Sequence, residues 1–291
     1  MLEIFQGQPC HRIRIDCGDT VLVAEQGAQL VSWVSGGRER LFLSPASRWD
    51  GHTAIRGGIP VCFPQFNARG SLPKHGFARN LAWTVGEPAR AQADSAQLVC
   101  ALRADARSLG IWPHAFEAQV RVTLNPGQVE VTLAVDNTGA QALQFSAALH
   151  TYLALDDIAQ ASLSGLGGQR EWDALSDSHA AAAPLLRFEG AFDRVYAAAA
   201  LPLILQDGAH QLEISQSPQW ADTVVWNPGE SACASMADMP ADGFAHMLCV
   251  EAAQVFQPVA LPPILHVCRT RYAAACLRPG PLWPSKGGPS L

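Results

Sequence analysis

The stretch that decides the fold class runs Glu117-Ala118-Gln119-Val120-Arg121-Val122-Thr123-Leu124, then Asn125-Pro126-Gly127, then Val129-Glu130-Val131-Thr132-Leu133-Ala134-Val135-Asp136. Apolar residues occupy every second position of the two outer runs. Because successive side chains of a strand point to opposite faces, this alternation is typical of strands with one buried face. Asn, Pro and Gly between the runs are turn residues. We therefore expect a β-hairpin over residues 117–136.

The same period of two recurs along most of the chain, and helical periodicity is weak. Many short strands separated by Gly and Pro indicate an antiparallel sandwich or barrel. We expect an all-β fold, a large antiparallel β-sandwich with few short helices, the best helical candidates being residues 169–176 and 237–243. Asp207-Gly208 predicts a second hairpin turn. The expected further strands are residues 12–16, 20–25, 30–34, 97–103, 144–154, 203–206, 211–215, 223–226 and 246–255.

Length and charge limit the possible functions. The chain has 291 residues, 48% hydrophobic and 16% charged, with a net charge of −6. This suffices for one large core, and we expect a single domain over residues 1–261. A mildly acidic chain without a basic block is a poor candidate for binding nucleic acid or an anionic membrane.

No secretory signal is visible and the longest apolar run, residues 196–205, is too short to span a bilayer, so we expect a cytoplasmic protein. We also expect a monomer.

Eight cysteines are spread through the sequence, and none belongs to a C-x-x-C pair. A zinc ribbon or a thioredoxin-type centre therefore has no support. Reduced thiols that fill small apolar positions are the favoured interpretation, and we expect no metal. The G-x-S-x-G, Walker A and H-E-x-x-H motifs are missing, and residues 164–170 fail the dinucleotide pattern. We expect no cofactor.

The segment after residue 261 departs from the strand pattern. It is rich in proline, and its apolar residues follow no period of two. Since proline donates no ladder hydrogen bond, we expect no central strand beyond Leu277. We treat residues 262–291 as an atypical tail and expect about the last fifteen residues to be poorly ordered or laid loosely on the surface.

Two titratable residues lie within apolar strand patterns. His150 shares a strand face with Ala148 and Tyr152. It is either a half-buried histidine bonded to backbone, which the segment alone favours, or a general acid or base, since imidazole titrates near neutral pH. Glu251 either points to water from an edge strand or serves as a base in a pocket, its pKa raised by desolvation. The local sequence favours neither interpretation of Glu251.

A group of basic residues lies in a region rich in Gly, Pro and aromatic residues. Arg56 heads Arg56-Gly57-Gly58-Ile59-Pro60, and Lys74-His75-Gly76-Phe77-Ala78-Arg79 follows soon after. Guanidinium and ammonium groups suit phosphate or carboxylate oxygens, and glycines let backbone approach a ligand. The alternative is a solvated surface cluster, against which the apolar neighbours of both arginines argue. Asp193, beside Arg194, is either half of a turn ion pair or an acceptor for sugar hydroxyls.

Together these segments resemble the hexose-6-phosphate mutarotase (glucose-6-phosphate 1-epimerase) family, within the aldose 1-epimerase, or galactose mutarotase-like, superfamily. The resemblance covers about residues 10–260. It is carried by six motifs in the family's order: Arg56-Gly57-Gly58-Ile59-Pro60, His75-Gly76-Phe77-Ala78-Arg79, Ala148-Leu149-His150-Thr151-Tyr152, Phe192-Asp193-Arg194-Val195-Tyr196, Trp226-Asn227-Pro228 and Val250-Glu251-Ala252-Ala253.

The resemblance implies a galactose mutarotase-like sandwich and an isomerase that interconverts the anomers of an aldohexose 6-phosphate. It implies that His150 is the catalytic acid and Glu251 the catalytic base. It further implies that Arg56 and Arg79 bind the phosphate and that Asp193 holds ring hydroxyls. The substrate-binding set is completed by His75 and by Lys74, which stands where the family often has glutamine.

Two other functions compete with this interpretation. An aldose 1-epimerase of free hexoses would run the same chemistry, but a neutral sugar does not need the Arg/Lys cluster. A non-catalytic carbohydrate-binding or sensor protein would keep the fold alone, and the presence of both His150 and Glu251 argues against it. The tail lacks the family's usual last strand pattern, and one hypothesis is a change of reading frame after about Pro262.

Overall fold

The predicted hairpin forms as the alternation requires. Strand β10 (Phe116–Asn125) pairs antiparallel with β11 (Gln128–Asn137), with Val120 opposite Leu133. The apolar positions of both strands are buried and the polar positions between them are not. The second predicted hairpin, around Asp207-Gly208, is also confirmed.

The computed structural model describes residues 1–86, 89–92, 94–263, 270–272 and 276–280. Every strand ladder of these residues is antiparallel. Eleven strands form the largest sheet, in the order β17-β14-β19-β20-β24-β11-β10-β9-β7, with β23 paired to β11 and β8 to β9. Besides the hairpin its members are β7 (Thr84–Val85), β8 (Ala89–Gln92), β9 (Ser95–Arg103), β14 (Ala161–Ser164), β17 (Leu185–Arg187), β19 (Leu203–Asp207), β20 (His210–Ser215), β23 (Thr270–Tyr272) and β24 (Cys276–Pro279).

A second sheet carries the residues of interest. Its eight strands follow the order β16-β15-β18-β21-β22-β12-β6, with β13 also paired to β22. They are β6 (Val61–Cys62), β12 (Leu143–Leu149), β13 (Tyr152–Ala154), β15 (Arg170–Asp173), β16 (Ser178–Ala181), β18 (Phe192–Ala197), β21 (Asp222–Asn227) and β22 (Met247–Leu261).

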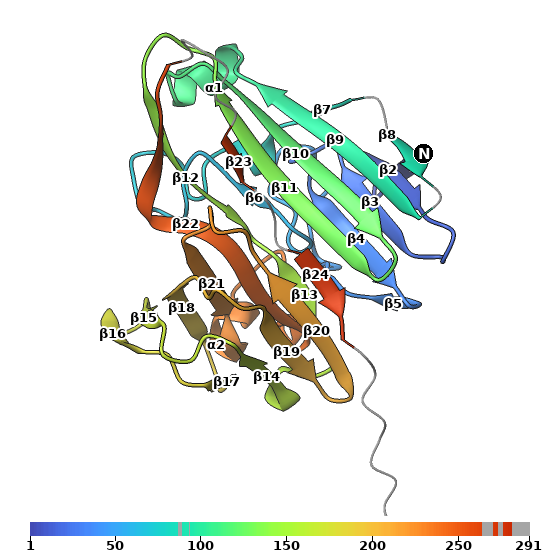
Figure 1. The fold of residues 1–291 in the computed structure, drawn as a ribbon, viewed down its shortest axis with the longest axis vertical. Coiled ribbons are helices and arrows are strands. Elements are labelled where there is room, and N and C mark those ends of the chain that lie inside the picture. Colours follow the sequence, from blue (N-terminus) through green and yellow to red (C-terminus); the bar gives the residue numbers. More distant parts are fainter. Residues whose placement is uncertain (87–88, 93, 264–269, 273–275, 281–291) are drawn as a thin grey trace, which may run out of the picture.

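A third sheet is an N-terminal meander of five strands, coloured blue in Figure 1. It consists of β1 (Leu2–Phe5), β2 (Gln8–Arg14), β3 (Thr20–Ala24), β4 (Leu30–Ser35) and β5 (Arg38–Glu39). In Figure 1 these blue strands and the green strands β9–β11 occupy the upper half of the molecule, and the yellow and orange strands the lower half. The expected all-β sandwich is thereby confirmed.

Helices are few and short, as predicted, but both predicted positions are wrong. Residues 170–173 form β15, because they pair with β16 and β18, and residues 237–242 are turns between α2 and η3. Helix α1, which an Asp105–Ser108 capping box begins, was not predicted from the sequence. The helices are η1 (Ala78–Asn80), α1 (Ala106–Ile111), η2 (Ile158–Gln160), α2 (Gly229–Ala234) and η3 (Gly243–His246).

The tail differs from the prediction. β24 lies between β20 and β11 and runs through Arg278 to Pro279, so the expectation of no central strand beyond Leu277 is wrong. Leu277 is fully buried in the main core. Burial of that one side chain favours the strand even though Pro279 at its end has no N–H to donate. Residues 281–291, to which the expectation of poor order chiefly applied, lie outside the described residues.

Strand β22 separates the core from the opposite face of its sheet. Leu248, Val250 and Ala252 belong to the main core, which Val120 of the hairpin sheet also joins. The alternate residues, among them Cys249 and Glu251, project from the other face. The titratable groups discussed below lie on this second face.

Candidate active site

His150 sits where two strands of the second sheet meet. It follows β12 directly and precedes β13, and its backbone N–H donates to Pro60. Its ring stacks on Tyr152, with centroids 4.8 Å apart and planes 11° apart. Leu149 and Leu153 point into the main core instead. The face assignment made from the sequence is therefore correct, although the segment contains a break rather than one continuous strand.

Glu251 occupies the middle of the sheet, because β22 has β21 on one side and β12 on the other. Its side chain is 1% exposed. The interpretation as an edge-strand glutamate pointing to water is therefore wrong. A carboxyl group this deeply buried needs a specific reason to be there, since glutamate is almost never fully buried without a partner.

The partner is His150. The Nδ1 atom of its imidazole lies 3.3 Å from Oε1 of Glu251. This approach lacks hydrogen-bond geometry: within the described part of the chain, His150 Nδ1 and Glu251 Oε2 have no hydrogen-bond partner. Unpaired buried polar atoms cost about 1–3 kcal/mol each. Two of them side by side indicate groups arranged for a ligand rather than for stability alone.

Burial shifts these two groups in opposite directions. Desolvation, helped by the nearby charges of Arg79 and Arg56, holds the pKa of His150 well below its ordinary value. Desolvation and the neighbouring Asp193 raise the pKa of Glu251 well above its ordinary value. Both shifts disfavour the charged forms. The pair is therefore suited to hold one proton between its two members at neutral pH.

His75 lies beside the pair as a neutral residue. Its Nδ1 accepts from the backbone N–H of Asn67 at 3.3 Å and lies 3.1 Å from Sγ of Cys62. Burial, then the charges of Arg79 and Lys74, lowers its pKa to about 3. Its ring contacts that of His150 edge to face, 5.6 Å between centroids. With Nδ1 accepting, Nε2 carries the proton and is free to donate.

Arg56 is held in place by Asp238 and Tyr152, neither of which was predicted from the sequence as its partner. Its Nε donates to Asp238, its Nη2 forms an ion pair with the same carboxylate, and its Nη1 donates to the Tyr152 hydroxyl. Although burial alone lowers it, Tyr152 and Asp238 hold the pKa of Arg56 above its usual value. Two of its five N–H donors make hydrogen bonds within the described chain. The other N–H groups of Nη1 and Nη2 can serve a ligand.

One cavity collects almost all of the predicted site residues. Its empty volume is about 520 Å³. Arg79 alone of the predicted set does not line it; its Nη2 donates to the backbone oxygen of Lys74, and its Nε has no partner in the described chain. The lining residues are Arg56, Phe66, Asn67, Lys74, His75, His150, Asp193, Val224, Trp226, Met236 and Glu251.

Asp193 projects into this cavity from β18. The turn ion pair considered for it is wrong, because Arg194 contacts Glu171 and Asp173 instead. Burial raises the pKa of Asp193, while the charge of Lys74 opposes that shift. A carboxylate at this place can accept hydroxyl hydrogen bonds of a ligand that reaches the pair.

The glycines of the Arg56 and His75 motifs serve packing rather than ligand approach. A Cβ on Gly58 would collide with the carbonyl oxygen of Leu30, and one on Gly76 with that of Phe63. Both residues also have positive φ, 60° and 68°. The expectation that these glycines let backbone contact a ligand is therefore replaced by a structural role: close backbone packing positions Arg56 and His75.

The unpredicted residues in or next to the cavity come mainly from distant segments; Trp226 and Met236 line it, and Asp238 and Cys249 contact or neighbour residues that do. Trp226 contacts His150 edge to face and lies in a quoted motif, which was a usable signal. Met236 and Asp238 follow α2 and had no local signal. Cys249 precedes Glu251 by two positions on the same face of β22, so the period of two could have found it.

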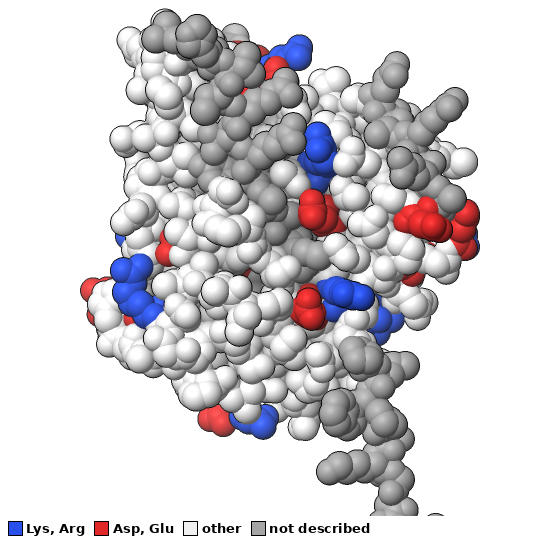
Figure 2. Space-filling view, in the orientation of Figure 1, with Lys and Arg blue, Asp and Glu red and all other residues white. Residues whose placement is uncertain are grey.

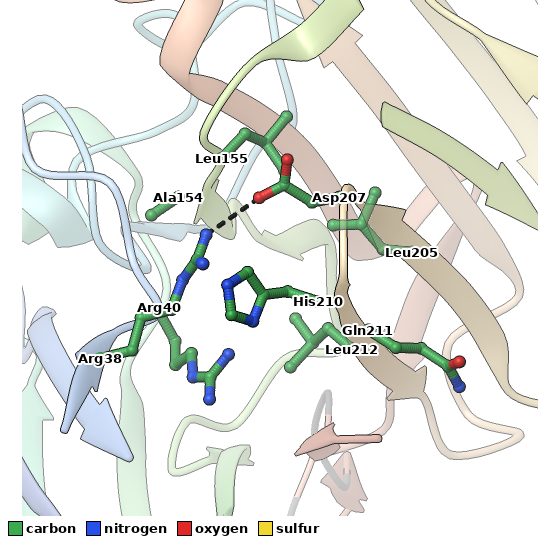
Figure 3. A pocket seen from close by; sticks show the side chains of 9 residues that line it. All are labelled: Arg38, Arg40, Ala154, Leu155, Leu205, Asp207, His210, Gln211 and Leu212. Atoms are coloured by element: carbon green, nitrogen blue, oxygen red, sulfur yellow. Dashed lines mark hydrogen bonds and ion pairs between the residues drawn. The ribbon is translucent and has the colours of Figure 1, made fainter. Parts of the chain in front are cut away.

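A second cavity, shown in Figure 3, has an empty volume of about 310 Å³. Arg38 and Asp207 pair across it, and Arg38 also contacts Asp156. His210 and Arg40 point into the same space. Arg38 is already neutralised by two carboxylates, and no imidazole there meets a carboxyl group among the contacts of the described residues. The described residues of this second cavity therefore provide no general acid and general base that could act on the same ligand atom.

Charges elsewhere are scattered. On the face shown in Figure 2, the described lysine and arginine side chains lie singly and mostly near aspartate or glutamate. No helix among the described residues combines the length and the apolar content needed to cross a membrane.

A large antiparallel sandwich with a buried imidazole–carboxyl pair in a cavity defines a galactose mutarotase-like protein. The chain belongs to the aldose 1-epimerase family, whose profile matches residues 9–263. It is 37% identical over 236 residues to a protein of Escherichia coli K12 named "Putative glucose-6-phosphate 1-epimerase", covering 79% of this chain and 78% of that protein. A protein of the same name from Cenchrus ciliaris is 35% identical over 248 residues, covering 81% and 75%.

Solved structures agree. The crystal structure of a Salmonella typhimurium protein described as a putative mutarotase (YeaD) superposes with a TM-score of 0.87 at 27% identity, covering 96% of this chain and 92% of that one. The resemblance found in the sequence is thus confirmed for the family and the fold.

Proposed function

We propose that this protein interconverts the α and β anomers of an aldohexose 6-phosphate, with glucose 6-phosphate as the first substrate to test. The observation that carries the proposal is the pairing of His150 and Glu251, 3.3 Å apart, at a cavity that Lys74 and Arg56 also line. The same cavity thus supplies an acid, a base and cations. A reducing sugar with a phosphate at its far end needs both.

The chemistry is proton transfer at the anomeric centre. Glu251 removes the proton of the anomeric hydroxyl as His150 donates a proton to the ring oxygen, and the C1–O5 bond breaks to give the open-chain aldehyde. Rotation about C1–C2 presents the other face of the carbonyl, and the two groups reverse their roles to close the ring. No atom is lost or gained. Acid and base catalysis of this kind contribute about 10²–10⁴-fold each.

The remaining residues position the substrate. Lys74 and Arg56, which line the cavity, form the proposed phosphate site together with Arg79, whose guanidinium contacts the Lys74 backbone; charge-assisted hydrogen bonds to phosphate are strong. Asp193 accepts from ring hydroxyls, and Nε2 of His75 donates to one. Binding energy from the distant phosphate then orients C1 between the catalytic groups. We expect the protein to work as a monomer in the cytoplasm, without a cofactor.

Saturation-transfer NMR between the two anomeric signals tests the proposal. Glucose 6-phosphate and free glucose should be compared at equal concentrations with the same preparation. We expect catalysed exchange of the phosphorylated sugar at a much higher kcat/KM. Equal exchange of both sugars would instead favour a free-hexose epimerase, and no exchange of either would refute the enzymatic proposal.

A further inference from the structure

We propose that the cavity floor is also an inhibitory site for a thiophilic divalent cation, zinc above all, held by His150, Cys249 and Glu251. One ligand atom from each residue lies within 4.8 Å of those of the other two, and all three residues are buried. Nitrogen, sulfur and oxygen donors together are the set that zinc prefers. Neither calcium nor magnesium selects a thiol ligand.

The spacing of the atoms supports a tetrahedral ion. Zinc–ligand lengths of about 2.0–2.3 Å at tetrahedral angles place neighbouring ligand atoms about 3.4–3.6 Å apart. His150 Nδ1 and Glu251 Oε1 already lie 3.3 Å apart without a hydrogen bond between them. Cys249 Sγ lies within 4.8 Å of the ligand atoms of both other residues, so it needs to approach them by at most roughly 1 Å to reach this spacing. The distance between His150 Nδ1 and Glu251 Oε1, which do not form a hydrogen bond, therefore suits two ligand atoms of one tetrahedral ion.

Two unsatisfied atoms point to a ligand independently of the cluster. His150 is 7% exposed and Glu251 1% exposed, and their Nδ1 and Oε2 atoms have no hydrogen-bond partner among the described residues. A cation on this site would satisfy Nδ1 and place positive charge beside the carboxylate that carries Oε2. Three protein ligands leave a fourth position toward the cavity for water or a sugar hydroxyl. Binding releases to solvent the thiol proton of Cys249 and the proton that His150 and Glu251 share.

The consequence is competition with the proposed reaction. An ion on Glu251 and His150 occupies the lone pairs through which these groups accept and return protons. Zinc should therefore inhibit anomer exchange reversibly, and a chelator should restore it. The inhibition depends on the proposed function, whereas metal binding does not.

The test compares two matched variants, Cys249→Ala and Cys100→Ala. Cys100 is equally buried but lies in the main core on β9. Both variants should keep the wild-type exchange rate in the absence of metal. Cys249→Ala should need at least about tenfold more zinc for half inhibition, while Cys100→Ala should match the wild type. Magnesium should not inhibit any of the three proteins.

Cobalt(II) gives a readout that does not need catalysis. The wild type and Cys100→Ala should show thiolate-to-cobalt charge-transfer absorption that zinc displaces, and Cys249→Ala should not. Identical cobalt spectra or identical zinc inhibition in all three proteins would overturn the proposal, as would activation by zinc. Cobalt binding without any anomer exchange would refute the proposed function and leave the metal site standing.

Discussion

Replacing Glu251 by glutamine isolates the proton-accepting role of the buried carboxyl group. The amide keeps the size of the side chain but cannot take up a proton. Loss of one general base corresponds to about 10²–10⁴ in kcat, or about 3–5 kcal/mol of transition-state stabilisation. Substrate binding should change much less, because the proposed phosphate contacts lie at Lys74, Arg79 and Arg56.

The same substitution should leave the fold intact. Glu251 Oε2 already has no hydrogen-bond partner in the described chain. Replacing it by an amide group therefore breaks no hydrogen bond of this atom. At about pH 5, where ionisation of Glu251 contributes little, we expect the free energy of unfolding to change by about 1 kcal/mol or less. Urea unfolding checks this before any kinetic measurement is interpreted.

The assay is anomer exchange of glucose 6-phosphate by saturation-transfer NMR, with Glu171→Gln as the matched control. Glu171 is a buried glutamate of the same sheet that pairs with Arg194 and does not line the cavity. The control should retain exchange within a few-fold of the wild type. A folded Glu251→Gln protein whose exchange rate stays within about tenfold of the wild type would refute the assignment of Glu251 as the base.

Three other measurements examine the phosphate contacts, the tail strand and the buried carboxyl group. Arg79→Ala should lower kcat/KM for glucose 6-phosphate about 10–100-fold but leave free glucose little changed; equal losses would contradict a phosphate role. Leu277→Ala should reduce the free energy of unfolding by about 2–5 kcal/mol, while the exposed neighbour change Arg278→Ala should be nearly neutral; equal stability of the two would place β24 outside the sheet. Because the folded-state pKa of Glu251 is raised, wild-type stability should fall as the pH rises above 4.5 toward the folded-state value. The stability of Glu251→Gln relative to the wild type should therefore increase between about pH 5 and about pH 8 in urea titrations, and a constant difference would show that the carboxyl pKa is not raised.

Much of this architecture could be predicted from the sequence, because one face of nearly every strand is buried. The alternation over residues 117–136 specifies the register of its hairpin, since a slip by one residue would expose every apolar side chain. The same argument placed His150 on a face with Tyr152. Along a strand, neighbouring side chains point to opposite faces and side chains two positions apart point to the same face, so these directions follow from the local backbone geometry.

Long-range pairing could not be predicted in the same way. β24 has two prolines nearby and no alternation, yet burial of Leu277 between β20 and β11 places it centrally. Asp238 is separated from Arg56 by 182 residues and lies in an irregular segment. No periodicity relates such residues, so their contact depends on the complete fold.

The opposite pKa shifts of His150 and Glu251 also bear on how the pair works. A neutral imidazole beside a protonated carboxyl group has as many protons as an imidazolium beside a carboxylate. Burial favours the first arrangement in the free protein, and the reaction as proposed uses the second. Transfer of one proton over a short distance interconverts them without exchange with solvent. A bound sugar places its anomeric hydroxyl against Glu251 and its ring oxygen against His150. Its hydrogen bonds to these groups are strongest when His150 is an imidazolium and Glu251 a carboxylate, so the sugar stabilises the charged arrangement. Desolvation therefore does not simply oppose catalysis here, because by raising the pKa of Glu251 it favours retention of a single proton within the pair.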